Sequence, residues 1–446
     1  MIKTQRVRMV AGFACLVLGC GGGTDGSPAP SGERENGGKG GQAAAGTGGT
    51  AGHLPSAGSS ASSGSAGNSG NSGSAADPPD EGGSGGAPAV TCDEPHARPS
   101  GAPALTVGAW TNVSPAGVPF NDGAFTQGMA IDPCDPSTLY LTVCSFDVEG
   151  DKAGLYKSTD AGATWERTSL LDEPIRIRID PHDSNHLYAV DGVRGNSQGF
   201  SVSFDGGKTF EHPQAFVDLK TSADMFQYDT YDLAVDPTDF AHVLVSHHSA
   251  WGWTDTKWNT NSGVLESKDG GVSWLVHEPL EGWGSGHAIN FLYEPTLGLG
   301  DSDTWLLGTQ GAGMFRTSDA GKTWTKVADI GIQHGGGSVY YDKAGILYAS
   351  GANKNLRSTD NGLTWTPISD PRGYNAVFGD GQLLYTAPGF GPTSFFTSPE
   401  GEGTTWTPFT PDQPFDSGPF EMALDRTNGI LYAACWGDGL WALKLP

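Results

Sequence analysis

The chain has 446 residues, and its 68 Gly and 29 Pro make a helix-rich fold unfavourable, because these are the two poorest helix formers. Hydrophobic residues make up 37%, too few for a multi-pass membrane protein, while 13 Trp, 12 Tyr and 19 Phe can fill a core. The net charge of −25 excludes a general nucleic-acid binder, because a polyanion repels phosphate groups.

Residues 1–20 have the pattern of an export signal. Basic residues at positions 3, 6 and 8 precede an apolar run, Met9 to Leu18, that is too short to cross a bilayer. The run ends in Leu-Val-Leu-Gly-Cys, which resembles the box of bacterial lipoproteins. The resemblance implies that Cys20 carries the lipid anchor and that the protein is exported to the cell envelope, at the outer membrane or cell surface. The alternative is an ordinary secretory signal with an incidental cysteine.

The next segment, residues 21–100, is expected to be a disordered linker rich in Gly, Ser and Ala. Its first seventy residues contain no Phe, Trp or Tyr, so they cannot bury enough apolar surface to offset the loss of chain entropy. We expect a tether between the lipid and a folded domain at residues 101–446.

One octapeptide recurs through the folded part. Five copies have the pattern Ser/Thr-x-Asp-x-Gly-x-Ser/Thr-aromatic: Ser158–Trp165, Ser203–Phe210, Ser267–Trp274, Thr317–Trp324 and Ser358–Trp365. A sixth, degenerate copy spans Thr397–Trp406, with Glu400 near the Asp position. The pattern predicts a tight turn in which Asp accepts backbone hydrogen bonds, Gly has a positive φ and the aromatic ring packs underneath. The repeated aspartates are therefore expected to be structural.

A second repeat runs in phase with the first. Seven apolar strands end in an Asp-Pro-like turn, and most continue into a Leu-Tyr strand; they are Met129–Asp132, Ile177–Asp180, Leu233–Asp236, Phe291–Glu294, Val339–Asp342, Ala376–Asp380 and Met422–Asp425. Each repeated unit has room for four short strands. Seven such units predict an all-β, seven-bladed β-propeller of four-stranded antiparallel blades. After Asp425 there is room for only three strands. Residues 109–113 are expected to supply the fourth strand and to close the ring.

The octapeptide resembles the Asp-box, or bacterial neuraminidase (BNR) repeat, of the sialidase, xyloglucanase and sortilin-like propellers. The resemblance implies a propeller in which ligands meet the face opposite the octapeptide turns. The longest loop expected on that face, residues 246–262, holds Trp251, Trp253 and Trp258, which are suited to stacking on sugar rings. These rings are otherwise expected to pack the loop onto the domain. Further candidate ligand-binding residues near the axis are His247, His287 and Trp436.

Arg176 and Arg178 alternate with isoleucines on a predicted innermost strand, where a buried charge needs a partner. Internal carboxylates are one such partner and favour a structural role. A carboxylated ligand in the central channel is the other, and it makes Arg176 a candidate binding residue.

Two functions of different class follow. The first is a surface-anchored binding protein for an extracellular ligand, a polysaccharide or another glycan ahead of a protein. The second is a glycoside hydrolase of the xyloglucanase-like or sialidase-like type, with a carboxylate pair in the central pocket. The candidate acids are Asp229, Asp232, Asp255 and Glu421, and a working pair is separated by ~5 to 9 Å.

The four cysteines that follow the lipid-anchor candidate favour disulfides, as is usual in an exported protein. We expect Cys134 to pair with Cys144 across a local turn, and Cys92 to pair with Cys435 at the seam of the ring. The sequence has no Cys/His metal spacing. We therefore expect no metal and no cofactor, and a monomer that contacts the membrane only through its lipid.

Overall fold

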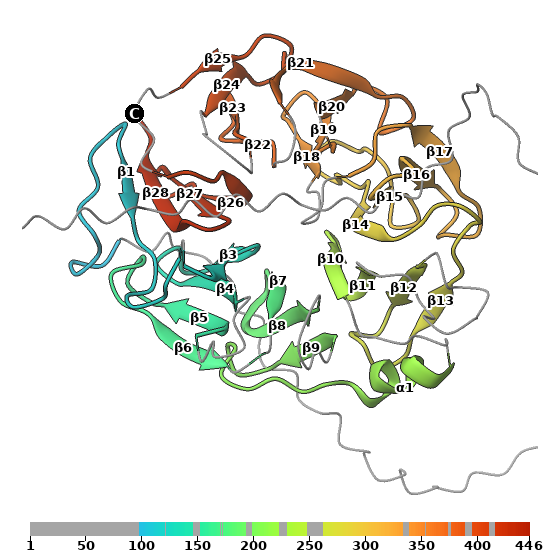
Figure 1. Ribbon diagram of the computed structural model, residues 1–446, viewed down its shortest axis with the longest axis horizontal. Coiled ribbons are helices and arrows are strands. Elements are labelled where there is room, and N and C mark those ends of the chain that lie inside the picture. The colour runs from blue at the N-terminus through green and yellow to red at the C-terminus, as the bar shows by residue number, and fades with distance from the viewer. Residues whose placement is uncertain are drawn as a thin grey trace, which may run out of the picture. The chain divides into compact units, whose positions relative to one another are not determined.

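The seven predicted units form a ring of seven sheets around a central axis (Figure 1). The computed structural model describes residues 98–120, 122–145, 152–169, 171, 173–192, 199–222, 230–247, 262–332, 339–352, 354–372, 376–388, 395–409 and 415–446. The all-β, seven-bladed propeller is confirmed. The described residues include one helix, α1 (Gln214–Ser222), which follows blade 2. No described helix has the length and apolar character needed to span a membrane.

The blades follow one another in chain order. Blade 1 contains β2 (Ala124–Phe125), β3 (Met129–Ile131), β4 (Leu139–Ser145), β5 (Gly154–Ser158) and β6 (Glu166–Ser169), and blade 2 contains β7 (Pro174–Asp180), β8 (Asp183–Asp191) and β9 (Phe200–Ser203). Blade 3 contains β10 (Thr230–Asp236), β11 (Asp239–His247), β12 (Val264–Ser267) and β13 (Leu275–His277), and blade 4 contains β14 (Gly286–Phe291), β15 (Trp305–Thr309), β16 (Met314–Thr317) and β17 (Thr325–Ala328). Blade 5 contains β18 (Val339–Tyr341), β19 (Leu347–Ala349), β20 (Lys354–Ser358) and β21 (Thr366–Arg372), and blade 6 contains β22 (Phe378–Gly379), β23 (Leu383–Thr386), β24 (Phe396–Pro399) and β25 (Thr407–Pro408). Blade 7 contains β26 (Pro419–Asp425), β27 (Ile430–Cys435), β28 (Gly439–Lys444) and β1 (Trp110–Asn112).

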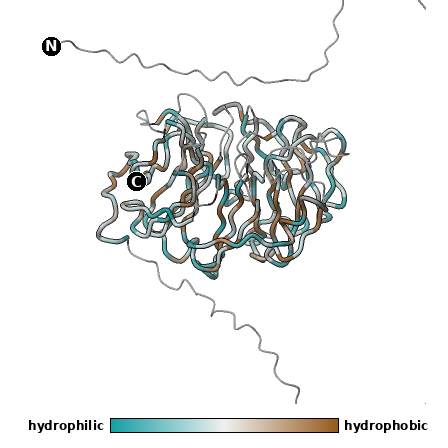
Figure 2. Tube along the Cα trace, turned by 60° about the horizontal axis from the view of Figure 1, so that its bottom comes forward, coloured by the Kyte–Doolittle hydropathy of each residue, from teal (hydrophilic) through white to brown (hydrophobic). Residues whose placement is uncertain are grey.

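The second strand of each blade forms the centre of the core. Five of these strands carry a Leu-Tyr pair, and all five tyrosines are fully buried: Tyr140, Tyr188, Tyr348, Tyr385 and Tyr432. Both faces of a blade pack against neighbouring blades, so a strand in this position is apolar on both sides. Figure 2 shows the hydrophobic segments running through the ring.

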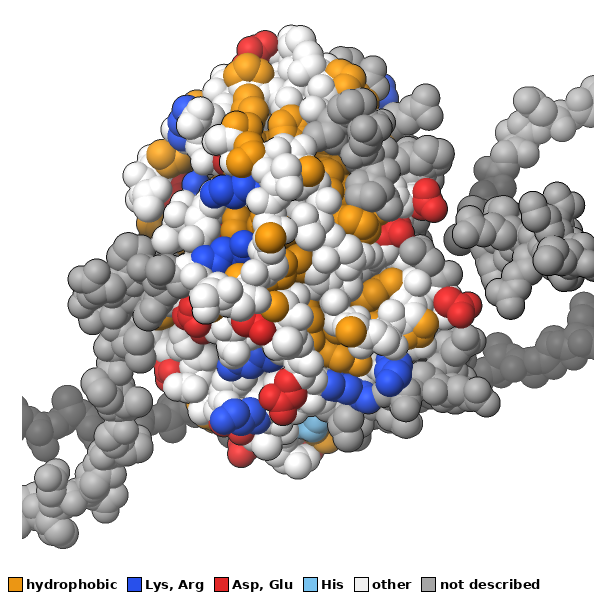
Figure 3. Space-filling view, turned by 90° about the vertical axis from the view of Figure 1, so that its left-hand side faces the viewer, with side chains coloured by type: hydrophobic (Ala, Val, Ile, Leu, Met, Phe, Trp, Pro, Cys, Tyr) orange, Lys and Arg blue, Asp and Glu red, His pale blue; other side chains and the backbone are white. Residues whose placement is uncertain are grey.

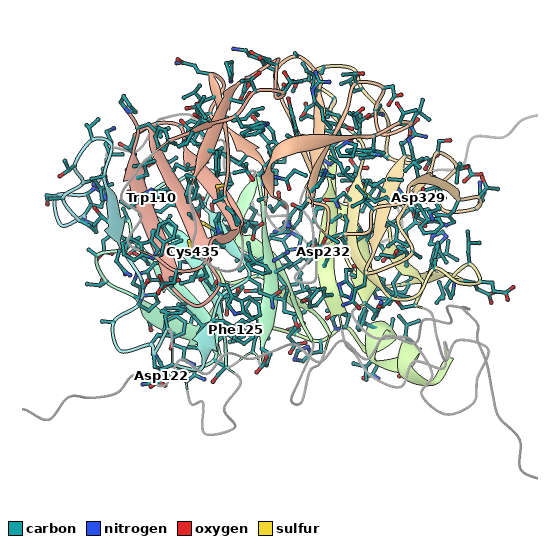
Figure 4. The ribbon with its side chains drawn as sticks, turned by 45° about the horizontal axis from the view of Figure 1, so that its top comes forward. Trp110, Asp122, Phe125, Asp232, Asp329 and Cys435 are labelled. Atoms are coloured by element: carbon teal, nitrogen blue, oxygen red, sulfur yellow. The ribbon has the colours of Figure 1, made fainter. Side chains whose placement is uncertain are left out.

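The ring is closed by the pairing of β1 with β28, as predicted. Trp110 lies opposite Leu443 in the antiparallel register, and Val113 N–H donates to Leu440 O at 2.9 Å. The Trp110 ring centroid lies 4.8 Å from that of Phe395, so the first strand also packs against blade 6 (Figure 4). The beginning of the folded region therefore completes the sheet formed by its end.

The five full octapeptide copies form tight turns, here called the octapeptide hairpins, between the third and outermost strands. In the first copy, Asp160 Oδ1 accepts from Thr164 N–H at 2.8 Å and Asp160 Oδ2 from the Thr164 hydroxyl at 2.6 Å. Gly162 has a φ of 89°, as the turn requires. The Asp side chain thus accepts from the backbone N–H four residues on, and in the second copy Asp205 Oδ1 also accepts from the N–H three residues on, that of Lys208, at 3.0 Å. The structural role of these aspartates is confirmed.

The degenerate sixth copy uses its acid differently. Glu400 Oε1 accepts from Gly381 N–H at 2.8 Å and from the Tyr340 hydroxyl at 3.0 Å. Glu400 therefore links blades 5 and 6, whereas the aspartates accept hydrogen bonds within their own hairpins.

The predicted cysteine pairing is wrong. Cys144 and Cys435 are both buried thiols. Cys134 is disulfide-bonded, so its partner is one of the cysteines outside the described residues. Cys134 lies in the turn before β4, whereas Cys144 is near the far end of that strand. A strand rises ~3.3 Å per residue, which places these residues beyond the reach of a disulfide.

Candidate functional site

The central channel is lined by the innermost strand of each blade, and its two ends differ (Figure 1). The strands of a blade are antiparallel. The turn between the first two strands and the octapeptide hairpin therefore lie at one end, here called the hairpin end. The loops between the second and third strands lie at the other end, called the loop end. β11 ends at His247 and β12 begins at Val264, both at the loop end, and the predicted tryptophans lie between them in the sequence, outside the described residues.

Polar, aromatic and aliphatic side chains line a cavity of about 220 Å³ within the channel. The lining residues come from six of the seven blades: Arg176, Arg178, Asp232, Asn290, Val339, Tyr340, Ala376, Val377, Phe378, Phe420, Glu421 and Met422. Three of the predicted site residues, Arg176, Asp232 and Glu421, are thus brought together here.

Arg176 on β7 forms a buried ion pair with Asp232 on β10. Arg176 Nε lies 3.1 Å from Asp232 Oδ1, and the two side chains are 4% and 5% exposed. The Arg176 guanidinium also donates to Gln127 O, and Asp232 accepts from Leu233 N–H at 3.0 Å and Ile289 N–H at 3.2 Å. Burial raises the pKa of Asp232, and the charges of Arg176 and Arg178 oppose that shift. This pair ties blade 2 to blade 3, on which Figure 4 labels Asp232.

Arg178, two residues along β7, forms a more accessible pair with Glu421 on β26. Arg178 Nη1 lies 3.1 Å from Glu421 Oε1, and Glu421 Oε2 accepts from Met129 N–H at 2.9 Å. The two side chains are 31% and 17% exposed. Both arginines on this strand therefore have internal carboxylate partners, as the structural interpretation of the sequence expected.

A second, wider cavity of about 320 Å³ lies toward the hairpin end. Residues of four innermost strands, β7, β10, β14 and β18, and of the turns that follow β10 and β14 line it: Arg178, Leu233, Ala234, Val235, Pro237, Asn290, Phe291, Tyr293, Glu294, Val339, Tyr340 and Tyr341. Arg178, Asn290, Val339 and Tyr340 line both cavities, so the two adjoin. Tyr293, Tyr340 and Tyr341 were not among the predicted site residues, because they belong to the strand repeat.

His247 and His287 do not lie at an exposed surface. Both side chains are fully buried, on β11 and β14, and the ring of His287 lies 5.0 Å from that of Tyr231. Their place in the interior does not favour the predicted contact with a ligand.

Trp436 is partly exposed at the loop end of blade 7. Its ring stacks on Phe125 with centroids 4.2 Å apart and lies 5.0 Å from Phe420, which lines the smaller cavity. This aromatic cluster packs the loop end beside the channel.

Several predicted site residues lie outside the described residues. They are the stacking candidates Trp251, Trp253 and Trp258, the acids Asp229 and Asp255, the lipid-anchor candidate Cys20, and Cys92. Within the described ranges, no cluster of three or more His, Cys, Asp or Glu side chains is arranged to hold a metal ion.

The outer surface is seen from one side in Figure 3. On the face shown in Figure 3, side chains of both charge signs are interspersed with hydrophobic ones, so this face presents no large region of a single charge.

No protein-family model matches the chain. It is 26% identical over 305 residues to a xyloglucanase of Paenibacillus sp, covering 59% of this chain and 28% of that protein. It is also 26% identical over 301 residues to a xyloglucanase of Hypocrea jecorina, covering 58% of this chain and 35% of that protein. The chain thus spans about a third of the length of these curated relatives.

Two solved structures share the fold. One is YCF48 from Cyanidioschyzon merolae, with a TM-score of 0.51, 14% identity, and 76% of this chain and 99% of that chain covered. The other is the extracellular domain of a putative hybrid two-component system from B. thetaiotaomicron, with a TM-score of 0.50, 11% identity, and 71% and 39% covered. The chain is therefore a seven-bladed β-propeller that is similar in sequence, over more than half its length, to xyloglucanases.

Proposed function

We propose that this chain is a lipid-anchored, exported propeller that binds an extracellular polysaccharide without cleaving it. The similarity to xyloglucanases supports a glycan as the ligand class. The lipoprotein-like box before Cys20 supports attachment to the cell envelope, with residues 21–100 as the tether.

The observation that carries the proposal is the state of the two channel carboxylates. A glycoside hydrolase needs one carboxylic acid to protonate the leaving oxygen and a second carboxylate to attack or to activate water. Asp232 is almost fully buried and bonded to Arg176 and two backbone amides. Glu421 is bonded to Arg178 and Met129 N–H. Two carboxylates held in this way support a structural role in the channel and a binding role for the protein.

Binding is proposed at the loop end, through Trp251, Trp253 and Trp258. Flat aromatic rings stack on the C–H faces of sugars, and polar neighbours bond the hydroxyl groups. Three tryptophans in a polar loop match this requirement.

Glycoside hydrolysis is the second candidate, favoured by the enzymatic names of the similar proteins. It would have to use acids other than the ion-paired ones. Asp229 and Asp255 are the candidates that the sequence supplies.

One panel separates the two functions. The full chain with Cys20→Ser, which prevents lipidation, is run in native gels containing xyloglucan, xylan, mixed-linkage glucan or polygalacturonate, and the same polymers are assayed for new reducing ends. We expect retarded migration in at least one polymer and no new reducing ends.

The matched variants are Trp251→Ala with Trp253→Ala and, as a control, Phe204→Ala. Phe204 is a 66% exposed aromatic in an octapeptide hairpin, at the opposite end of the ring. Loss of retardation in the double variant, with retardation kept in Phe204→Ala, supports polysaccharide binding through the tryptophan loop. Reducing ends that disappear in Asp229→Ala or Asp255→Ala would overturn the binding function in favour of hydrolysis.

A further inference from the structure

We propose that the wider cavity at the hairpin end of the channel is a subsite for one neutral sugar ring. The subsite is lined by Arg178, Asn290, Tyr293, Glu294, Tyr340 and Tyr341. It rests on the proposed function for the kind of polymer, and it adds a second place of contact at the end of the ring opposite the tryptophan loop.

Aromatic carbon forms part of the wall of this cavity. The Tyr340 hydroxyl donates to Glu400 at 3.0 Å, and the Tyr341 hydroxyl donates to Asn361. Neither Glu400 nor Asn361 lines the cavity. The hydroxyls of both tyrosines are thus engaged elsewhere, and their ring carbons are the parts left to line the cavity. Rings fixed in this way provide apolar surface at little entropic cost.

Polar groups with remaining hydrogen-bonding capacity face the same space. Arg178 uses Nη1 for Glu421 and Ile177 O, and within the described part of the chain Nε and Nη2 have no bonded partner. Glu294 uses Oε1 for Thr296, and Oε2 has no partner among the described residues. A guanidinium edge can donate to one sugar hydroxyl and a carboxylate oxygen can accept from another.

The balance of charge selects a neutral ligand. Arg178 and Glu294 are the two charged residues that line this cavity, and their formal charges cancel. Arg178 is already paired with Glu421 at 3.1 Å, so an anion gains little here. A cation would meet the Arg178 guanidinium in the same cavity, which opposes the aromatic attraction that tyrosines offer to cations. The cavity therefore offers a hydrogen-bond donor, a hydrogen-bond acceptor and aromatic surface, and its wall has no net charge. A polyhydroxylated sugar ring fits this combination.

The size of the cavity selects a short ligand. Small-molecule pockets are usually roughly 300–1,000 Å³. At about 320 Å³ this cavity is at the lower limit, and the adjoining space of about 220 Å³ is smaller still. One sugar ring, at the end of a chain or free, suits this volume better than an extended polymer.

Saturation-transfer-difference NMR on the full chain with Cys20→Ser tests the assignment. Methyl β-D-glucopyranoside, methyl β-D-xylopyranoside, choline and glucuronate are compared at equal concentration. We expect saturation of a neutral glycoside and little or none of choline or glucuronate. Preferential binding of choline or glucuronate, or no binding of either neutral glycoside, overturns the proposal.

Two variants locate the binding. Tyr293→Ala removes one ring, and Glu294→Gln removes the charge while its amide oxygen still accepts from Thr296. Each is expected to weaken glycoside binding about tenfold. Phe204→Ala, which removes an exposed aromatic ring from an octapeptide hairpin and leaves the cavity lining intact, is the control and should bind like the unmodified chain. Unchanged binding in both Tyr293→Ala and Glu294→Gln overturns the site, and Glu294→Gln decides if Tyr293→Ala fails to fold.

The outcome is distinguishable from that of the polysaccharide experiment. If polymers retard the protein but the glycosides do not bind, the subsite is wrong and the proposed function stands. If the glycosides bind in a Tyr293-dependent manner but no polymer retards the protein, the subsite stands and polysaccharide binding at the loop end is wrong.

Discussion

Arg178 Nη1 lies 3.1 Å from Glu421 Oε1, and this ion pair joins the innermost strands of blades 2 and 7 across 243 positions of sequence. Two positions before Arg178, Arg176 makes a more deeply buried pair with Asp232 of blade 3. A single strand, β7, thus connects three blades through charges that face the channel. Because the two ion pairs differ in exposure, we expect their removal to cost different amounts of folding stability.

Asp232→Ala is expected to destabilise the protein by about 3–5 kcal/mol, because it leaves the buried Arg176 without a counter-charge. Urea unfolding followed by tryptophan fluorescence measures the change. The double variant Arg176→Met with Asp232→Leu removes both charges and should recover most of the lost stability. A double variant as unstable as Asp232→Ala would show that packing, not the unpaired charge, sets the cost.

Glu421→Gln is expected to cost at most about 1 kcal/mol, because partly exposed ion pairs contribute little and the amide oxygen can still accept from Met129 N–H. The same urea experiment at low and high salt is the measurement. The difference between Glu421→Gln and the unmodified chain should shrink at high salt. A cost equal to that of Asp232→Ala would contradict the difference in exposure.

The octapeptide aspartates predict how stability depends on acid pH. Hydrogen bonds from the side chain and backbone of Thr209 lower the pKa of Asp205 from 3.8 to about 2, and Thr323 does the same for Asp319. A carboxylate whose pKa is lowered in the folded state adds stability above about pH 4, and this stability is lost as pH falls toward 2. Urea midpoints at pH 5, 3.5 and 2.5 should therefore decrease, and less steeply in Asp205→Asn. An equal slope in that variant would exclude Asp205 as a contributor.

The cysteines predict a simple pattern of reactivity. Cys144 and Cys435 are buried thiols, and burial raises the pKa of Cys435. Both should resist iodoacetamide in the native protein and react once it is unfolded. If Cys20 is acylated and residues 1–19 are removed, Cys92 is the one remaining partner for Cys134. Peptide mapping should then find a Cys92–Cys134 disulfide, and a linkage of Cys134 to Cys20 would contradict the lipid anchor.

Trp110→Ala tests the closure of the ring. The half-buried ring packs on Phe395 and Phe415, so its loss should cost about 2–3 kcal/mol, somewhat less than a fully buried aromatic residue. Hydrogen exchange is followed by mass spectrometry in the variant and in the unmodified chain. The variant should accelerate exchange more in β28 than in β15, which is on the far side of the ring. Uniform acceleration would indicate that blade 7 does not open separately.

The fold was predictable from the sequence because every blade needs the same kinds of residue at the same places. Each octapeptide needs an Asp, a Gly and an aromatic residue for one turn, and each inner strand needs an apolar run. The number of blades can therefore be read from the number of repeats. The seam was predictable because Trp110 repeats the pattern of an outer strand. The internal partners of Arg176 and Arg178 followed from the cost of burying a charge.

The site was less predictable because it is formed between blades. No sequence period tells which carboxylate meets Arg176 across the channel, or that Tyr293 and Tyr340 line one cavity. The one signal was Glu294, which stands where the other strand repeats have Asp. The predicted disulfide pairing was wrong for a similar reason. The spacing of cysteines along the chain does not reveal that β4 separates Cys134 from Cys144.

The hydrogen-bonded pairing of β1 with β28 makes this fold a candidate for circular permutation. Because the first and last strands are neighbours in one sheet, a short peptide can join residue 446 to residue 109 while new termini open in the exposed turn between β16 and β17. Such a rearranged gene should encode the same ring with its covalent break in blade 4.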